Sequence, residues 1–313
     1  MDQASRRRGG CRTSWCAKVV TVAFATFLAA AEQVARADEI TPMLLRESAH
    51  DDATGELLAL LAALTAPEQR KIEGLYLAFD PSTTEVASLP ACDDDGDYVV
   101  VMTEGLLRLA ESVSFAKASD DVRGSHIIDD YGALLARPQS VTGASISESR
   151  PVAPLPPPPS SKAASVAALG RAPAGGAPPV VERAHAIFQD LLLWLMAAEV
   201  AHVLAGDYSC PNPTAAHEHA DEVWTPSEHV AAIVSARSRM GHQARADAWA
   251  TTSLLALGRP YAAALAWLDV LAPIERTRGG GERVWYLAVH PNTPDRASTV
   301  RSAAEAWRLQ QAP

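Results

Sequence analysis

Residues 197–207 of the chain read Ala-Ala-Glu-Val-Ala-His-Val-Leu-Ala-Gly-Asp. They end a mostly apolar segment, residues 180–205, whose length predicts one long helix that stops at Gly206. The segment carries polar side chains at Gln189, Asp190, Glu199 and His202. These polar residues favour a buried helix of a soluble protein, because a membrane span needs about 20 predominantly apolar residues.

The end of this helix matches the zinc-binding motif H-E-x-x-H at two of its three polar positions. Glu199 stands at the position of the general base and His202 at that of the second zinc ligand, whereas Ala198 replaces the first histidine. In the intact motif the two histidines are four residues apart and lie on one helix face, so that one Zn²⁺ binds both. Alanine has no lone pair to offer a metal. We therefore expect a metallopeptidase-type helix with damaged metal chemistry.

Three other segments follow the order seen around such a helix in one family of zinc enzymes. Residues 98–107 read Tyr-Val-Val-Val-Met-Thr-Glu-Gly-Leu-Leu, residues 243–250 read Gln-Ala-Arg-Ala-Asp-Ala-Trp-Ala, and residues 290–296 read His-Pro-Asn-Thr-Pro-Asp-Arg. Together with residues 198–202, the chain resembles the gluzincin metallopeptidases of the CAAX-prenyl-protease type. These segments correspond to a strand before the metal helix, an E-x-x-A-D helix and a C-terminal H-P-x-T-x-x-R segment.

The resemblance implies an α+β fold, mainly helical and zincin-like, with a small β-sheet. It also implies that residues 98–102 form an edge strand, along which an extended polypeptide binds by β-augmentation. The residues of this expected substrate strand are Tyr98, Val99, Val100, Val101 and Met102. If the resemblance holds, the lost and retained motif positions come together in space; they are Ala198, Glu199, His202, Gln243 and Asp247.

Only one of the three zinc ligands that the resemblance implies is retained. The ligand glutamate of the family falls on Gln243, whose neutral amide is a poor ligand, and Asp247 remains as the residue that orients His202. A catalytic zinc site normally has three protein ligands and a water. His217 and His219, in the loop after the helix, are the candidate replacement ligands. We therefore favour a protein without a cofactor. The alternative is a site that still binds zinc through rearranged ligands.

The N-terminal region predicts a signal peptide over residues 1–37. A basic segment precedes an apolar run at residues 19–31, and Ala35-Arg36-Ala37 matches a cleavage site. The apolar run is too short for a typical transmembrane helix. An uncleaved N-terminal anchor is the alternative interpretation. Cleavage predicts a secreted or periplasmic protein with no remaining membrane segment.

Residues 138–179 divide the remaining chain. They hold ten of the 22 prolines and no aromatic residue, so they cannot bury enough apolar surface to offset their ordering entropy. We predict a disordered insertion here. It separates an N-terminal part of the domain, residues 38–137, from the metal-type helix and C-terminal helical part, residues 180–313. The expected elements also include a helix that begins after Thr103 and a strand at residues 284–289.

Charge and cysteine content limit the partners and the compartment. Loss of residues 1–37 removes six of the 27 basic and two of the 37 acidic side chains, which changes the net charge from −10 to −14. Such acidity argues against nucleic acid and anionic membrane surfaces as partners. Cys92 and Cys210 remain after cleavage, and in an oxidising compartment they predict one disulfide.

Three hypotheses of function follow. We favour an exported pseudo-peptidase that has lost its zinc site and binds an extended polypeptide or protein partner without cleaving it. The enzymatic alternative is an active zinc-dependent endopeptidase with rearranged ligands, in which Glu199 is the general base. The third is an exported structural domain without a ligand.

Overall fold

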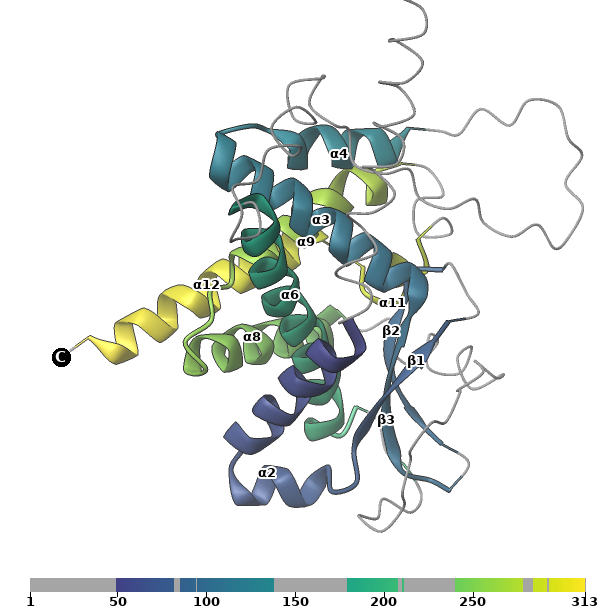
Figure 1. Ribbon diagram of the computed structural model, residues 1–313. Coiled ribbons are helices and arrows are strands. Elements are labelled where there is room, and N and C mark those ends of the chain that lie inside the picture. Colours follow the sequence, from purple (N-terminus) through teal and green to yellow (C-terminus); the bar gives the residue numbers. More distant parts are fainter. Residues whose placement is uncertain are drawn as a thin grey trace, which may run out of the picture. The chain divides into compact units, whose positions relative to one another are not determined.

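The computed structural model describes residues 49–81, 85–93, 95–137, 179–207, 210, 240–277, 284–291 and 293–312. All of them belong to one compact unit, Leu45–Pro313. The fold is α+β, mainly helical with a small three-stranded sheet, as the sequence predicts (Figure 1). The predicted signal peptide, the predicted insertion apart from Pro179, and the histidines at 217 and 219 lie outside the described residues.

The elements follow one another from a helix at residues 49–63 to the C-terminal helix. They are α2 (Ala66–Lys71), β1 (Tyr76–Asp80), β2 (Ser88–Cys92), β3 (Tyr98–Thr103), α3 (Glu104–Arg123), α4 (Ile127–Ala136), α6 (Pro179–Leu204), α8 (Met240–Ala256), α9 (Ala262–Glu275), α11 (Trp285–Val289) and α12 (Thr293–Gln311).

The three strands pair in the order β1-β3-β2, so β3 is the central strand. It runs parallel to β1, with Tyr76 opposite Val99, and antiparallel to β2, with Ser88 opposite Met102. The prediction of an edge strand at residues 98–102 is therefore wrong. Every residue of β3 is buried, which is typical of a strand with a neighbour on each side and cover on both faces.

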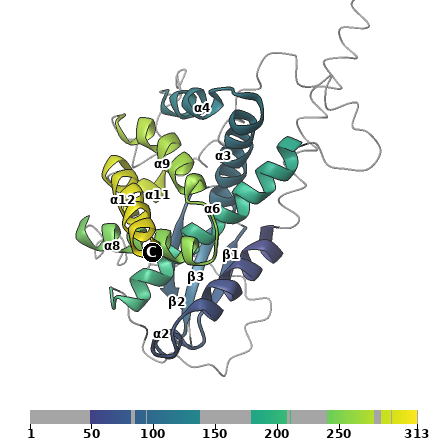
Figure 2. The same ribbon diagram turned by 90° about the vertical axis from the view of Figure 1, so that its left-hand side faces the viewer.

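The helix α6 forms the centre of the helical body. It packs against α3, α8 and α9 and against the strands β2 and β3, and Figures 1 and 2 show it between α3 and α8. By length and composition α6 could cross a membrane, but 89% of its most apolar window is buried inside the domain. This burial is typical of a core helix, which also explains why the helix is apolar on most of its faces.

Local sequence signals account for several helix ends. The side chain of Thr103 accepts a hydrogen bond from the backbone N–H of Leu106 at 3.2 Å and so caps α3, as predicted. The helix α6 ends at Leu204, and Gly206 follows in the turn with a φ of 74°, in the left-handed region that favours glycine.

The predicted strand at residues 284–289 is wrong, because residues 285–289 form the short helix α11. Tyr286 of this helix donates one backbone hydrogen bond to the carbonyl oxygen of Val86 at 2.7 Å, but no strand ladder forms between the two segments. The β-propensity of the residues is overridden here by their tertiary surroundings.

Candidate functional site

The three motif positions on α6 are all buried. Ala198, Glu199 and His202 are each no more than 2% exposed. The helical repeat places Ala198 and His202 on one face, as the motif requires. Yet Glu199 and His202 have separate sets of partners.

Glu199 contacts a histidine that comes from the C-terminal segment of the chain. Its Oε1 lies 3.3 Å from Nε2 of His290, and both side chains are about 1% exposed. The same Nε2 lies 3.1 Å from the carbonyl oxygen of Ser88, and Nδ1 lies 2.8 Å from Oε1 of Gln243. Both ring nitrogens therefore face acceptors, so the imidazole donates from both and carries a positive charge beside Glu199.

Gln243 and Asp247 continue this network on α8. The Nε2 of Gln243 donates to Oδ1 of Asp247 at 3.0 Å, and Arg296 binds both oxygens of Asp247 at 2.8 and 2.9 Å. Arg296 also donates to the carbonyl oxygen of His290 at 3.2 Å and to the hydroxyl of Tyr286 at 3.1 Å. Charge-assisted bidentate pairs of this kind are among the strongest polar contacts in proteins.

The guanidinium of Arg296 lies between two aromatic rings. Its centre is 5.4 Å from the ring centroids of both Trp194 and Tyr286. Burial by itself would lower the pKa of Arg296, but the carboxylate of Asp247 and the hydroxyl of Tyr286 outweigh it and raise the pKa above its usual value. Burial raises the pKa of Tyr286. Arg296 therefore remains a permanent cation in the core, neutralised by Asp247.

The expectation that Asp247 orients His202 is wrong. Both carboxylate oxygens of Asp247 are bound by Arg296, and one also accepts from Gln243. His202 bonds Asp207 instead, with Nδ1 donating to Oδ2 at 3.0 Å. Asp207 follows the end of α6, so the chain can turn its carboxylate back toward His202 after Gly206.

Asp207 also joins α6 to the start of α8. It pairs closely with His242 and accepts a hydrogen bond from Arg245 at 3.2 Å. Burial pushes the pKa of Asp207 upward, but the hydrogen bonds from His202 and His242 outweigh it, so that the pKa lies below its usual value. The carboxylate is therefore ionised, and Nδ1 of His202 must be the donor.

The other ring nitrogen of His202, Nε2, is buried and has no hydrogen-bond partner among the residues that the structure describes. Since Nδ1 is bound to Asp207, Nε2 is the ring atom left for a further partner. Zinc-bound histidines have the same arrangement, with one nitrogen on the metal and the other on a carboxylate. His202 is therefore oriented by Asp207 in the way that a carboxylate orients a histidine at a metal site.

The described residues do not assemble a full ligand set around His202. No group of three or more histidine, cysteine or acidic side chains among them could hold a metal ion. Ala198 provides no ligand, and the amide of Gln243 is occupied by His290 and Asp247. The candidate replacement ligands, His217 and His219, lie outside the described part of the chain.

The strand next to α6 is β2, and its outer side is in contact with the C-terminal segment. Besides the contact of His290 with Ser88, the backbone N–H of Tyr286 donates to the carbonyl oxygen of Val86, just before the strand. Pro90, within the strand, has no N–H to offer. An extended polypeptide therefore cannot pair along this side of β2 without displacing these contacts.

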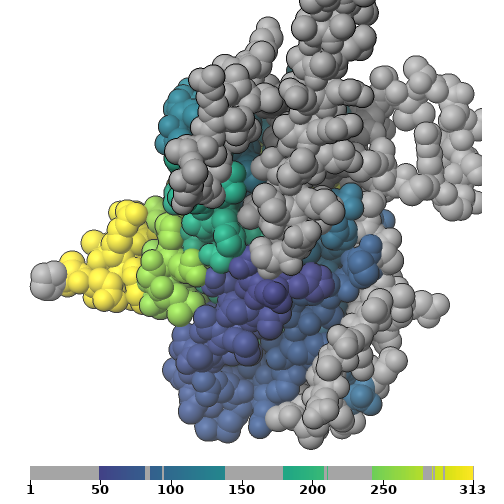
Figure 3. All heavy atoms as spheres, viewed as in Figure 1, coloured from purple at the N-terminus to yellow at the C-terminus, as the bar shows by residue number. Residues whose placement is uncertain are grey.

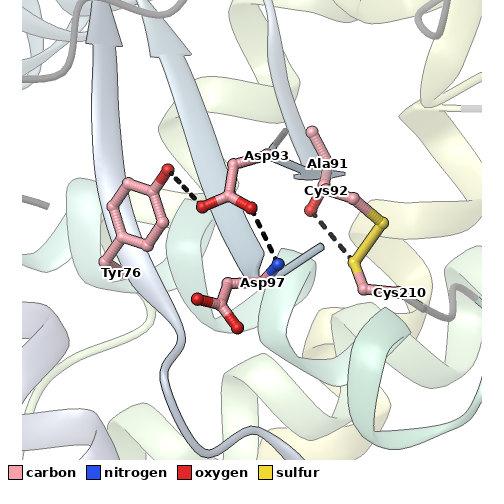
Figure 4. Close-up of a disulfide and its surroundings, with 6 residues drawn as sticks. All are labelled: Tyr76, Ala91, Cys92, Asp93, Asp97 and Cys210. Carbon is pink, nitrogen blue, oxygen red and sulfur yellow. Dashed lines mark hydrogen bonds between the residues drawn. A yellow bond between two sulfur atoms is a disulfide. The ribbon is translucent and has the colours of Figure 1, made fainter. Parts of the chain in front are cut away.

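The predicted disulfide is present. Cys92, at the end of β2, and Cys210, after α6, are bonded with their Cα atoms 5.5 Å apart (Figure 4). Beside it, Asp93 accepts hydrogen bonds from the hydroxyl of Tyr76 and the backbone N–H of Asp97, which fixes the turn between β2 and β3. Such a bridge is compatible with an oxidising compartment.

Comparison of the chain with protein-family models, with curated proteins and with solved structures gives no match.

Proposed function

We propose that this protein is an exported pseudo-peptidase, in which the place of a zinc centre is taken by a buried hydrogen-bonded network. The observation that carries the proposal is the contact between Glu199 and His290 at 3.3 Å, continued through Gln243, Asp247 and Arg296. A general base must reach a water whose proton it takes. Here the carboxylate is neutralised by an imidazolium within the core.

The network also favours glutamine over the ligand glutamate at position 243. A glutamate at position 243 would place a second carboxylate beside Asp247, where the Gln243 amide now donates a hydrogen bond. The amide suits a structural role, because it accepts from His290 and donates to Asp247 at the same time. Gln243 therefore serves as a link between the two buried ion pairs.

Polypeptide binding along residues 98–102 is no longer part of the proposal, because β3 is a central strand. The role that remains is that of an exported domain whose former catalytic centre stabilises its core. The disulfide and the predicted signal peptide support a secreted or periplasmic location.

A peptidase assay on the purified full-length protein tests the proposal. The protein is supplied with zinc and incubated with unfolded casein and with a mixture of quenched fluorescent peptides. We expect no cleavage above that of a matched Glu199→Gln variant, which removes the only general base that the motif provides. Cleavage by the wild-type protein that disappears in Glu199→Gln would contradict the proposal.

One observation favours the enzymatic alternative, a zinc endopeptidase with rearranged ligands. The Nε2 of His202 is buried, oriented by Asp207 and without a partner among the described residues. In this alternative His217 and His219 complete the ligand set with His202. Zinc titration calorimetry on the wild type and on His202→Ala tests it, because specific binding must disappear in the variant.

A further inference from the structure

The helix of residues 49–63 is fastened to α6 by polar contacts at two levels. At the first level, Asp52 accepts a hydrogen bond from Gln189 at 3.0 Å and pairs with His185 at 2.9 Å. At the second level, Glu56 lies one helical turn further along and meets Asp190 of α6 through a shared arginine. Figure 3 shows the helix of residues 49–63 in purple at the surface, beside α6.

The shared arginine is Arg259, in the turn between α8 and α9. Its guanidinium binds Glu56 at 2.6 Å and Asp190 at 3.3 Å. The side chain of Asp190 is 4% exposed and that of Glu56 is 10% exposed. One cation thus faces two buried acids, which leaves one negative charge in excess if both are ionised.

The two acids are not equally well paired. Glu56 holds the shorter bond to Arg259, whereas Asp190 is more deeply buried and more distant from the cation. An isolated charge in a buried position is costly, and the group takes up a proton instead. Burial accordingly raises the pKa of Asp190 to about 6, despite the opposing effect of Arg259, and it also raises the pKa of Glu56.

Other charged groups surround this cluster. Asp52 lies on the same helix as Glu56, and Arg183 and His185 lie on α6. Arg183 is bound to Asp121 of α3 at 2.8 Å, so it is largely neutralised.

We propose that Glu56, Asp190 and Arg259 form a clasp that takes up one proton and holds the helix of residues 49–63 on α6 more firmly in mildly acidic than in alkaline surroundings. The pKa of Asp190 is higher in the folded state than in the unfolded chain. Its contribution to stability is therefore complete below the unfolded pKa and is lost as the pH rises through about 6. This inference is independent of the proposed function.

Hydrogen exchange of the backbone amides in residues 53–63 tests the clasp. The full-length wild type and an Asp190→Asn variant are compared at pH 5 and pH 8, after correction for the intrinsic pH dependence of exchange. We expect the fall in protection from pH 5 to pH 8 to be about tenfold larger in the wild type than in Asp190→Asn, because only the wild type can ionise at position 190. The variant should keep only the pH dependence of groups that both proteins share, such as His50.

Two further variants test the role of Glu56 and control for the loss of an acid elsewhere in the chain. Glu56→Gln should weaken the pH dependence without abolishing it, because Asp190 then has Arg259 to itself but stays buried. Asp295→Asn on α12, far along the chain, should behave like the wild type. Burial lowers the pKa of His50, which loosens the same helix in acid, but His50 is common to all variants. A wild type whose pH dependence equals that of Asp190→Asn would overturn the clasp.

Discussion

Glu199 and His202 lie one turn apart on the same helix, yet their surroundings differ. Around Glu199 the polar groups are joined to one another by His290, Gln243, Asp247 and Arg296. Around His202 a single carboxylate orients the ring, and Nε2 has no partner among the described residues. Glu199 is thus part of a continuous buried network, whereas His202 has one ring nitrogen oriented by a carboxylate and the other without a partner among the described residues.

The largest expected effect lies on the Glu199 side. Arg296→Ala should lower the free energy of unfolding by about 3–5 kcal/mol, because it leaves Asp247 as an unpaired buried charge. Denaturant unfolding measures the loss. As a control, Arg308→Ala removes an exposed arginine that contacts Tyr261 and should cost about 0.5 kcal/mol. A loss below about 1 kcal/mol for Arg296→Ala would show that the network is not a structural core.

The disulfide ties the end of α6, near His202, to the sheet. The double change Cys92→Ser and Cys210→Ser should cost about 2–4 kcal/mol, because the bridge closes a long loop with a sequence separation of 118 residues. Thermal unfolding of the variant and of the wild type measures the difference. Thiol titration of the non-reduced, denatured mature protein, which lacks Cys11 and Cys16, should find no free thiol, and two free thiols would refute the bridge.

A third prediction concerns a double variant that introduces the two ligands missing from the zinc motif. Ala198→His with Gln243→Glu should destabilise the protein by about 1–3 kcal/mol without zinc, because Ala198 is fully packed and Gln243 faces Asp247. Zinc should then stabilise the double variant, by about 2.7 kcal/mol at 100 times its Kd. The melting temperature with and without zinc measures this gain. No shift in the double variant would mean that His202 does not retain ligand geometry.

The smallest effect compares the two motif residues directly. Glu199→Gln removes the counter-charge of His290, whereas His202→Gln leaves Asp207 bound to His242 and Arg245. We expect Glu199→Gln to be the more destabilising by about 1 kcal/mol. Denaturant midpoints of the two variants, measured at one pH, give the difference. Equal losses of stability in the two variants would show that the surroundings of Glu199 and His202 do not differ in energetic importance.

Much of the fold can be predicted from local patterns in the sequence. The apolar run at residues 180–205 predicts α6, the run at residues 98–102 predicts a strand, and Thr103 predicts the start of α3. The position of β3 within the sheet could not be predicted in the same way. It depends on β2, a short strand that contains Pro90, a residue that argues against a strand.

The residues of the candidate site could be named from the sequence, but their hydrogen bonds and ion pairs could not. The resemblance implies that Glu199, Gln243 and Asp247 approach one another, and in the structure His290 joins Glu199 to Gln243, which binds Asp247. The sequence carries His290 and Arg296 in the H-P-x-T-x-x-R segment, but which acid each binds depends on how α8 and α12 pack. Asp207 was missed as the partner of His202, because its role depends on the turn at Gly206.

The zinc content of the purified full-length protein tests the central claim most directly. Elemental analysis of protein prepared without chelators measures zinc per chain in the wild type and in His202→Ala. We expect no stoichiometric zinc in either protein, since Ala198 and Gln243 supply no ligand and Glu199 contacts His290. One tightly bound zinc per wild-type chain, lost in His202→Ala and in His217→Ala or His219→Ala, would contradict the account and establish an active metal centre.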